Sequence, residues 1–100
     1  MSVLVTVRVS GDPKGVEAYD AATIQGVADR GKAAGAIRHR FFTNGGEVMV
    51  VDEWPDRESF QAFFESETEI QSVMAAAGVT SPPTIEFWDR MDVNESINWD

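Results

Sequence analysis

A chain of 100 residues with 43% hydrophobic side chains is long enough to fold as one domain around one core. Its formal net charge of −9 excludes nucleic acids and anionic membranes as expected partners, because both attract basic surfaces. Without cysteine there is no disulfide, thiolate nucleophile or cysteine metal site, and no apolar run approaches the ~18 residues of a membrane span. By default, we expect a cytoplasmic protein.

The first predicted strand spans residues 3–9, where valine alternates with other side chains. Asp12, followed by proline, is typical of the start of a helix. Apolar side chains at helical spacing then predict one continuous helix over residues 13–30. Gly31 or Gly35 ends this helix, since glycine suits the left-handed conformation after a helix C-terminus.

A β-hairpin follows, with strands predicted over residues 36–43 and 47–54. The Asn44-Gly45 pair between them is the strongest short-range hairpin signal that a sequence offers. If this pair forms a two-residue turn, His39 lies opposite Val50 in the neighbouring strand.

The two faces of this hairpin carry different side chains. One face is mostly apolar but contains His39 and Asp52, which the two-residue turn would place diagonally to each other. Any loop with an even number of residues keeps this grouping, whereas an odd loop would swap the faces. The other face mixes arginine and glutamate with apolar residues, so neither face is typical of simple exposure to solvent.

Two helices are predicted after the hairpin. Asp56 is a candidate N-cap for a helix over residues 56–64. A second, short amphipathic stretch predicts a helix over residues 67–77. The first of these helices places three aromatic side chains on one face: Phe60, Phe63 and Phe64.

Residues 84–91 alternate again and predict a fourth strand. The order β-α-β-β-α-β is that of the ferredoxin-like fold, an α+β architecture with both helices on one face of an antiparallel sheet. We assign this domain to residues 1–93 and treat residues 94–100 as an acidic C-terminal tail.

One face of such a sheet stays without helices. It would expose Leu4, Trp88 and either Met49 or Val50, which one subunit cannot cover. A second copy of the chain, related by a two-fold axis, would supply the cover. We therefore expect a homodimer.

Three segments resemble the dimeric α+β barrel superfamily, and within it the antibiotic-biosynthesis-monooxygenase-like (ABM-like) proteins: Gly35-Ala36-Ile37-Arg38, Val50-Val51-Asp52-Glu53-Trp54 and Glu58-Ser59-Phe60-Gln61-Ala62-Phe63-Phe64. The resemblance implies a homodimer whose two sheets form a barrel, with a small pocket between helices and sheet in each subunit. It also implies one of several activities, since some members are cofactor-free oxygenases of electron-rich aromatic molecules, whereas others degrade haem or isomerise small metabolites.

Within this resemblance, one position matches and another departs. An acidic residue two positions before the tryptophan at the strand end is typical, and Asp52 matches it. Phe63 stands where a histidine is common on the second helix, and the first strand carries no counterpart of the asparagine of haem-degrading members. These departures argue against the corresponding chemistries.

The candidate catalytic residues are His39 and Asp52. His39 is the only histidine, and a nearby carboxylate would orient its ring as a general base requires. The alternative is a buried structural pair. Five aromatic residues are candidates for binding a small apolar or aromatic ligand, although core packing or, for the last, contact with a partner subunit also fits them: Trp54, Phe60, Phe63, Phe64 and Trp88.

No phosphate loop, dinucleotide fingerprint or metal-ligand spacing is present in the sequence, so we expect neither a cofactor nor a metal. Two classes of function remain. The first is a cofactor-independent monooxygenase that acts on a small aromatic or quinol-like molecule. The second is a non-catalytic dimer that binds a small ligand or serves a structural role.

Overall fold

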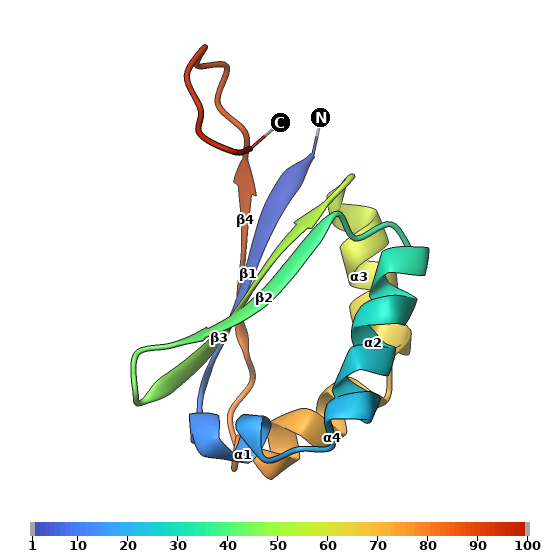
Figure 1. The fold of residues 1–100 in the computed structure, drawn as a ribbon, viewed down its shortest axis with the longest axis vertical. Coiled ribbons are helices and arrows are strands. Elements are labelled where there is room, and N and C mark those ends of the chain that lie inside the picture. The colour runs from blue at the N-terminus through green and yellow to red at the C-terminus, as the bar shows by residue number, and fades with distance from the viewer. Residues whose placement is uncertain (1, 100) are drawn as a thin grey trace.

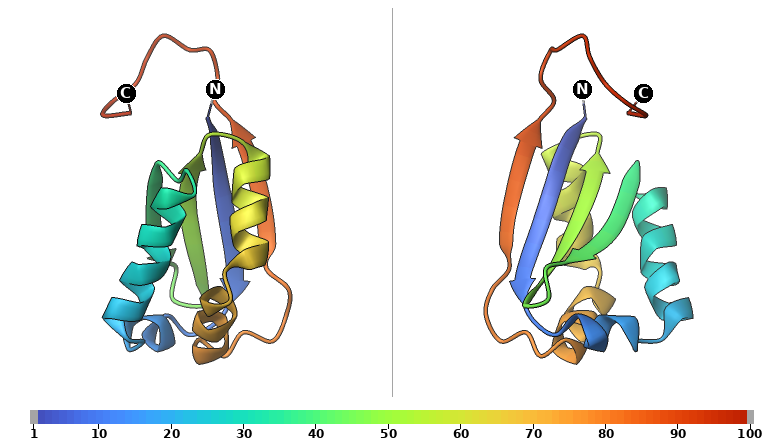
Figure 2. Two further views of the ribbon diagram at one scale, coloured as in Figure 1. Left: turned by 90° about the vertical axis from the view of Figure 1, so that its right-hand side faces the viewer. Right: turned by 60° about the vertical axis from the view of Figure 1, so that its left-hand side comes forward.

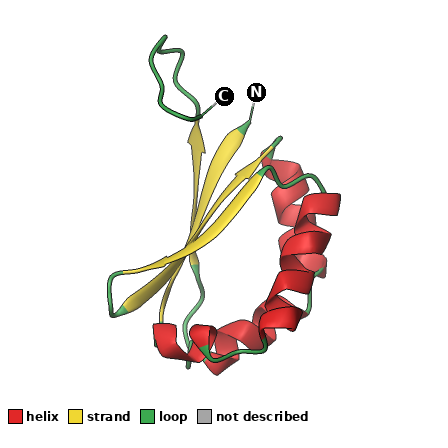
Figure 3. Ribbon diagram, viewed as in Figure 1, coloured by secondary structure: helices red, strands yellow, loops and turns green. Residues whose placement is uncertain are grey.

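In the computed structural model, which describes residues 2–99, helices cover one face of a four-stranded antiparallel sheet and leave the other face open (Figures 1 and 3). The strands lie in the order β2-β3-β1-β4. This is the predicted ferredoxin-like α+β fold. Its elements are β1 (Val3–Ser10), α1 (Pro13–Glu17), α2 (Ala21–Ala33), β2 (Arg38–Thr43), β3 (Glu47–Trp54), α3 (Arg57–Ser66), α4 (Glu69–Ala76) and β4 (Thr84–Asp89).

The continuous first helix predicted over residues 13–30 is wrong, because the structure has two helices there. The Asp20 side chain accepts a hydrogen bond from the backbone N–H of Thr23 at 2.9 Å and so begins a new helix. Gly35 follows this helix with φ of +123°, as expected for a residue after a helix C-terminus. Gly31, the other predicted end, is buried within α2.

The break between α1 and α2 lets α1 pack closely on α4. A Cβ atom on Gly15 would lie only 2.3 Å from the carbonyl oxygen of Ala76, so this approach requires glycine. Tyr19, in the connection, donates its hydroxyl to Glu69 at 3.1 Å. These contacts turn the chain under the sheet before α2 begins (Figure 1).

The hairpin is present, but the predicted two-residue turn is wrong. Thr43 pairs with Val48, so His39 lies directly opposite Asp52 rather than opposite Val50. The wider loop arises because the Asn44 side chain accepts hydrogen bonds from two backbone N–H groups of the loop, at 3.0 and 2.7 Å. The loop is still even in length, so the grouping of side chains into two faces is confirmed.

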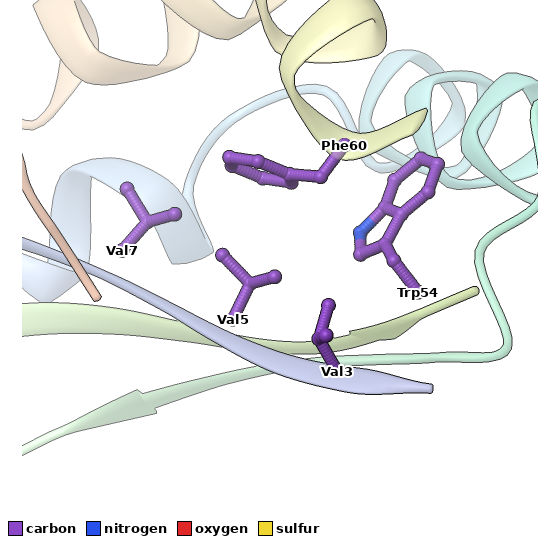
Figure 4. Packing of buried hydrophobic residues seen from close by; sticks show 5 residues of the cluster. All are labelled: Val3, Val5, Val7, Trp54 and Phe60. Carbon is purple, nitrogen blue, oxygen red and sulfur yellow. The ribbon is translucent and has the colours of Figure 1, made fainter. Parts of the chain in front are cut away.

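The core lies where β1 and β3 meet α3 (Figure 4). Val5 and Trp54 are almost fully buried, and Phe60 extends from α3 towards the valines of β1. The rings of Trp54 and Phe60 meet edge to face with their centroids 5.9 Å apart. This cluster fixes α3 over the end of β3.

The covered face of the sheet carries the odd-numbered residues of β1, β2 and β4 and the even-numbered residues of β3. The open face carries the alternate residues. The right-hand view of Figure 2 shows this open face, with the C-terminal segment arching beyond the sheet. Its residues are Leu4, Thr6, Arg8, Ser10, Arg38, Arg40, Phe42, Glu47, Met49, Val51, Glu53, Thr84, Glu86 and Trp88.

The last strand ends at Asp89, earlier than the predicted residue 91. Residues 90–99 contain no helix or strand, and Trp99 packs over the guanidinium of Arg38, whose Cζ lies 4.8 Å from the ring centroid. Asp100, part of the predicted acidic tail, lies outside the described residues. Among residues 2–99, no helix combines the length and the apolar character that a membrane crossing needs.

Candidate functional site

A cavity of about 120 Å³ lies between the covered face of the sheet and the helices. Its walls come from β1, β2 and β3 and from all four helices of residues 2–99. The lining side chains are aliphatic or aromatic except those of His39 and Asp52. The structure therefore has a pocket at the place that the resemblance implies, with one polar end.

His39 and Asp52 form a direct contact at this polar end. They occupy opposite positions on β2 and β3, and Nδ1 of His39 lies 2.7 Å from Oδ1 of Asp52. The other carboxylate oxygen, Oδ2, accepts a hydrogen bond from the indole N–H of Trp54 at 3.1 Å. Because side chains alternate along a strand, Asp52 and Trp54 reach the same face. Both carboxylate oxygens are thus engaged.

This arrangement assigns different roles to the two ring nitrogens of His39. An ionised carboxylate can only accept hydrogen bonds, so the contact with ionised Asp52 requires a proton on Nδ1 of His39. Nε2 is then the nitrogen that can take up another proton. The ring is held edge to face against Phe41 with centroids 5.2 Å apart.

His39 also connects the cavity with solvent. It lies on β2, an edge strand of the sheet, and its side chain is 33% exposed, whereas that of Asp52 is 11% exposed. A group that borders both the cavity and water can pass a proton between them. The paired arrangement is that of a general base oriented by a buried carboxylate.

Four of the five aromatic candidates line the cavity. Phe63 lies 5.5 Å from Trp54 between ring centroids, and Phe64 stacks on Phe60 at 5.4 Å. These rings pack against one another yet leave the cavity open beside them. Trp88 is placed elsewhere, half-exposed on the open face, where its indole N–H donates to Oγ1 of Thr6 at 3.4 Å. A ligand-binding role for these residues stays a prediction.

The sequence reasoning missed Gly31 as a residue of the site. This glycine is buried in α2 and lines the cavity, where a Cβ atom would lie 3.4 Å from Cζ of Phe63. The sequence did contain a signal for it, because Gly31 is the second glycine in a stretch with helical periodicity. Glycine lowers the stability of a helix, so its presence there indicates that close packing requires it.

An ion pair between Arg30 and Glu67 connects the helices that line the cavity. Arg30 of α2 donates from Nε and Nη2 to the two carboxylate oxygens of Glu67, both at 2.8 Å. Glu67 lies between α3 and α4, so the pair ties α2 to the other helices. The hydrogen bonds from Arg30 lower the pKa of the Glu67 carboxyl. Among residues 2–99, no cluster of three or more His, Cys, Asp or Glu side chains is arranged to hold a metal ion.

No protein-family model matches the chain, and no curated protein matches its sequence. Solved structures do share its fold. A Bordetella bronchiseptica protein provisionally named an antibiotic biosynthesis monooxygenase superposes with a TM-score of 0.66 at 12% identity, over 90% of this chain and 97% of that chain. A Nitrosomonas europaea protein of unknown function, NE2512, gives a TM-score of 0.63 at 19% identity, over 97% and 96%.

SnoaB, a cofactor-independent oxygenase from Streptomyces nogalater, also shares the fold. It superposes with a TM-score of 0.58 at 14% identity, over 95% of this chain and 98% of that chain. At identities this low, what is shared is the fold. The chain shares the fold of structures that are named as antibiotic biosynthesis monooxygenases, in agreement with the resemblance seen in the sequence.

Proposed function

We propose that this protein is a cofactor-independent monooxygenase that acts on a small aromatic or quinol-like molecule held in the cavity. The observation that carries the proposal is the contact between His39 and Asp52 at the single polar end of an otherwise apolar cavity. The likeness to SnoaB supports it, because SnoaB is a cofactor-independent oxygenase with the same fold.

The reaction begins with a proton transfer within the site. Nε2 of His39 accepts the proton of a substrate hydroxyl, and the adjacent Asp52 stabilises the resulting imidazolium. The electron pair of the broken O–H bond stays on the substrate oxygen, which makes the ring electron-rich. Dioxygen then oxidises the ring carbon. One of its oxygen atoms becomes a new carbonyl oxygen, the other leaves as water, and the substrate loses two hydrogen atoms.

We also propose that two copies associate through their open faces, in the cytoplasm. Trp88 and Phe42 are 54% and 50% exposed there, and Met49 belongs to this face, whereas Val50 lines the cavity. An interface between two such sheets would bury these side chains from water. A chain without cysteine also suits the reducing cytoplasm.

The test is oxygen uptake by the purified protein in the presence of hydroquinones, polyphenols and phenols with a single hydroxyl. With isotopically heavy oxygen gas, one labelled atom should enter the product and the other should appear in water. His39→Ala should lower turnover by at least ~10²-fold, as expected when a positioned general base is lost. Lys14→Ala is the control, because Lys14 is an exposed basic residue of α1 that neither lines the cavity nor belongs to the sheet.

Several outcomes would count against the proposal. Full turnover in a folded His39→Ala variant would show that this pair is not the site. Loss of folding in that variant would make the pair structural. No oxygen uptake with any substrate in the panel would favour a non-catalytic dimer that binds a small ligand.

A further inference from the structure

The size of the cavity restricts what can enter it. An engineered cavity of about 150 Å³ lined by aliphatic and aromatic side chains binds benzene. The cavity here measures about 120 Å³, so it has room for one six-membered ring with small adjustments of the walls. A second fused ring would exceed this space. Two of the lining residues, Trp54 and Phe60, are almost fully buried in the core, so they resist displacement.

Gly31 leaves space at the part of the cavity wall where α2 faces α3. A Cβ atom at this position would lie 3.4 and 3.6 Å from the ring of Phe63 and 4.0 Å from Cβ of Ala36. These are ordinary van der Waals distances, so an alanine would fit without clashing and would add a methyl group to the cavity wall. The space that a ligand can use is therefore set in part by the missing side chain.

The polar groups of the cavity restrict the chemistry of the ligand. Both oxygens of Asp52 are engaged, by His39 and Trp54, which leaves Nε2 of His39 to meet a ligand hydroxyl. A second hydroxyl across the ring would face aliphatic and aromatic side chains. It would lose its hydrogen bonds to water without replacement, which weakens binding.

We propose that the cavity takes a single-ring phenol with one hydroxyl and a small apolar substituent, and that Gly31 sets the size limit. This inference rests on the proposed function only in placing the reacting hydroxyl at His39. In the first step the O–H bond of the phenol breaks, an N–H bond forms at Nε2, and the electron pair stays on the phenolate oxygen.

The test is equilibrium binding of three probes in the absence of oxygen, measured by isothermal titration calorimetry. Para-cresol should bind at least about tenfold more tightly than hydroquinone, because only hydroquinone buries an unpaired hydroxyl. Naphthol, with two fused rings, should not bind. Equal or tighter binding of hydroquinone or naphthol would overturn the inference, and so would failure of para-cresol to bind.

Two alanine variants of α2 test the role of Gly31. Gly31→Ala should weaken para-cresol binding about tenfold, because the added methyl group takes space from the ligand. Gly26→Ala is the matched control, since its Cβ would meet only the flexible end of Arg30, at 3.3 Å, and Gly26 does not line the cavity. Equal affinities in the two variants would overturn the assignment of Gly31.

A third variant keeps the test decisive if Gly31→Ala does not fold. Phe63→Leu removes part of the same wall and should allow naphthol to bind. If naphthol still does not bind, this wall does not set the size limit of the ligand.

Measurements of oxygen uptake distinguish a failure of this inference from a failure of the proposed function. Para-cresol that binds as predicted but consumes no oxygen would refute the monooxygenase and leave the size limit intact. Turnover of multi-ring substrates alone would support the monooxygenase and refute the size limit.

Discussion

Two pairs, each of a basic and an acidic side chain, lie next to each other on β2 and β3, on opposite faces of the sheet. On the covered face, His39 contacts Asp52 at 2.7 Å, and on the open face, Arg38 contacts Glu53 at 2.9 Å. Both carboxylates are buried. The two pairs occupy neighbouring positions of one ladder, so they lie on the same two strands and differ in chemistry and surroundings.

The two pairs differ in whether the basic side chain can transfer a proton. A guanidinium stays charged in proteins, and Arg38 also donates to the backbone carbonyl of Trp99 at 3.1 Å. An imidazole can gain or lose a proton near neutral pH, and His39 borders a cavity. A buried acid is therefore a weak sign of function by itself. A titratable partner that faces a cavity is a stronger one.

The largest predicted difference between the pairs is in turnover. Asp52→Asn should lower turnover by at least ~10²-fold, because the variant no longer stabilises the imidazolium of His39. Glu53→Gln makes the same chemical change one residue along the strand and should leave turnover within a few-fold of the wild type. Steady-state oxygen uptake measures both. Equal losses in the two variants would remove the distinction between the faces.

The open face should show its role in association. Trp88→Glu should weaken the proposed dimer at least about tenfold, because a charge replaces a large aromatic side chain in the expected interface. Sedimentation velocity over a range of concentrations measures this change. Ile97→Glu is the control, since Ile97 is 87% exposed on the C-terminal segment and does not belong to the sheet. A wild-type chain that remains monomeric at high micromolar concentration would contradict the dimer.

The sequence was sufficient to predict the fold and the face shared by His39 and Asp52, because both depend on periodicity and on an even loop. It was not sufficient for the register, which depends on side-chain hydrogen bonds of Asn44 within the loop. It also missed the break before α2, where Asp20 caps a new helix. Gly31 could not be assigned, since its role depends on Phe63 of another helix.

Arg38 should matter for stability rather than for chemistry. Arg38→Gln leaves the buried carboxylate of Glu53 without its guanidinium partner, which should lower the free energy of unfolding by about 1–2 kcal/mol. This value lies below that of a fully buried pair because Arg38 is partly exposed. Urea denaturation measures it. Trp99→Leu removes the aromatic contact with Arg38 but keeps the ion pair with Glu53, and it should cost less, about 0.5–1 kcal/mol.

The ion pair between Arg30 and Glu67 provides a third, more exposed case, with the smallest expected effect. Hydrogen bonds from Arg30 lower the pKa of Glu67 in the folded protein, so its carboxylate stabilises the fold at pH values above the unfolded pKa of about 4.3. That stabilisation is lost as the pH falls through the folded pKa. Since Arg30 is half-exposed, Glu67→Gln should lower the free energy of unfolding by no more than about 1 kcal/mol at neutral pH.

The pH dependence of this difference tests the cause. The gap in unfolding free energy between the wild type and Glu67→Gln should be constant from pH 7 down to about pH 5 and should then shrink towards zero in more acidic solution. Denaturation by urea at several pH values measures it. A gap that does not change with pH would show that Glu67 stabilises the helices through packing. The contact between Arg30 and Glu67 would then hold the helices together by packing rather than by charge, unlike the pairs Arg38–Glu53 and His39–Asp52 within the sheet.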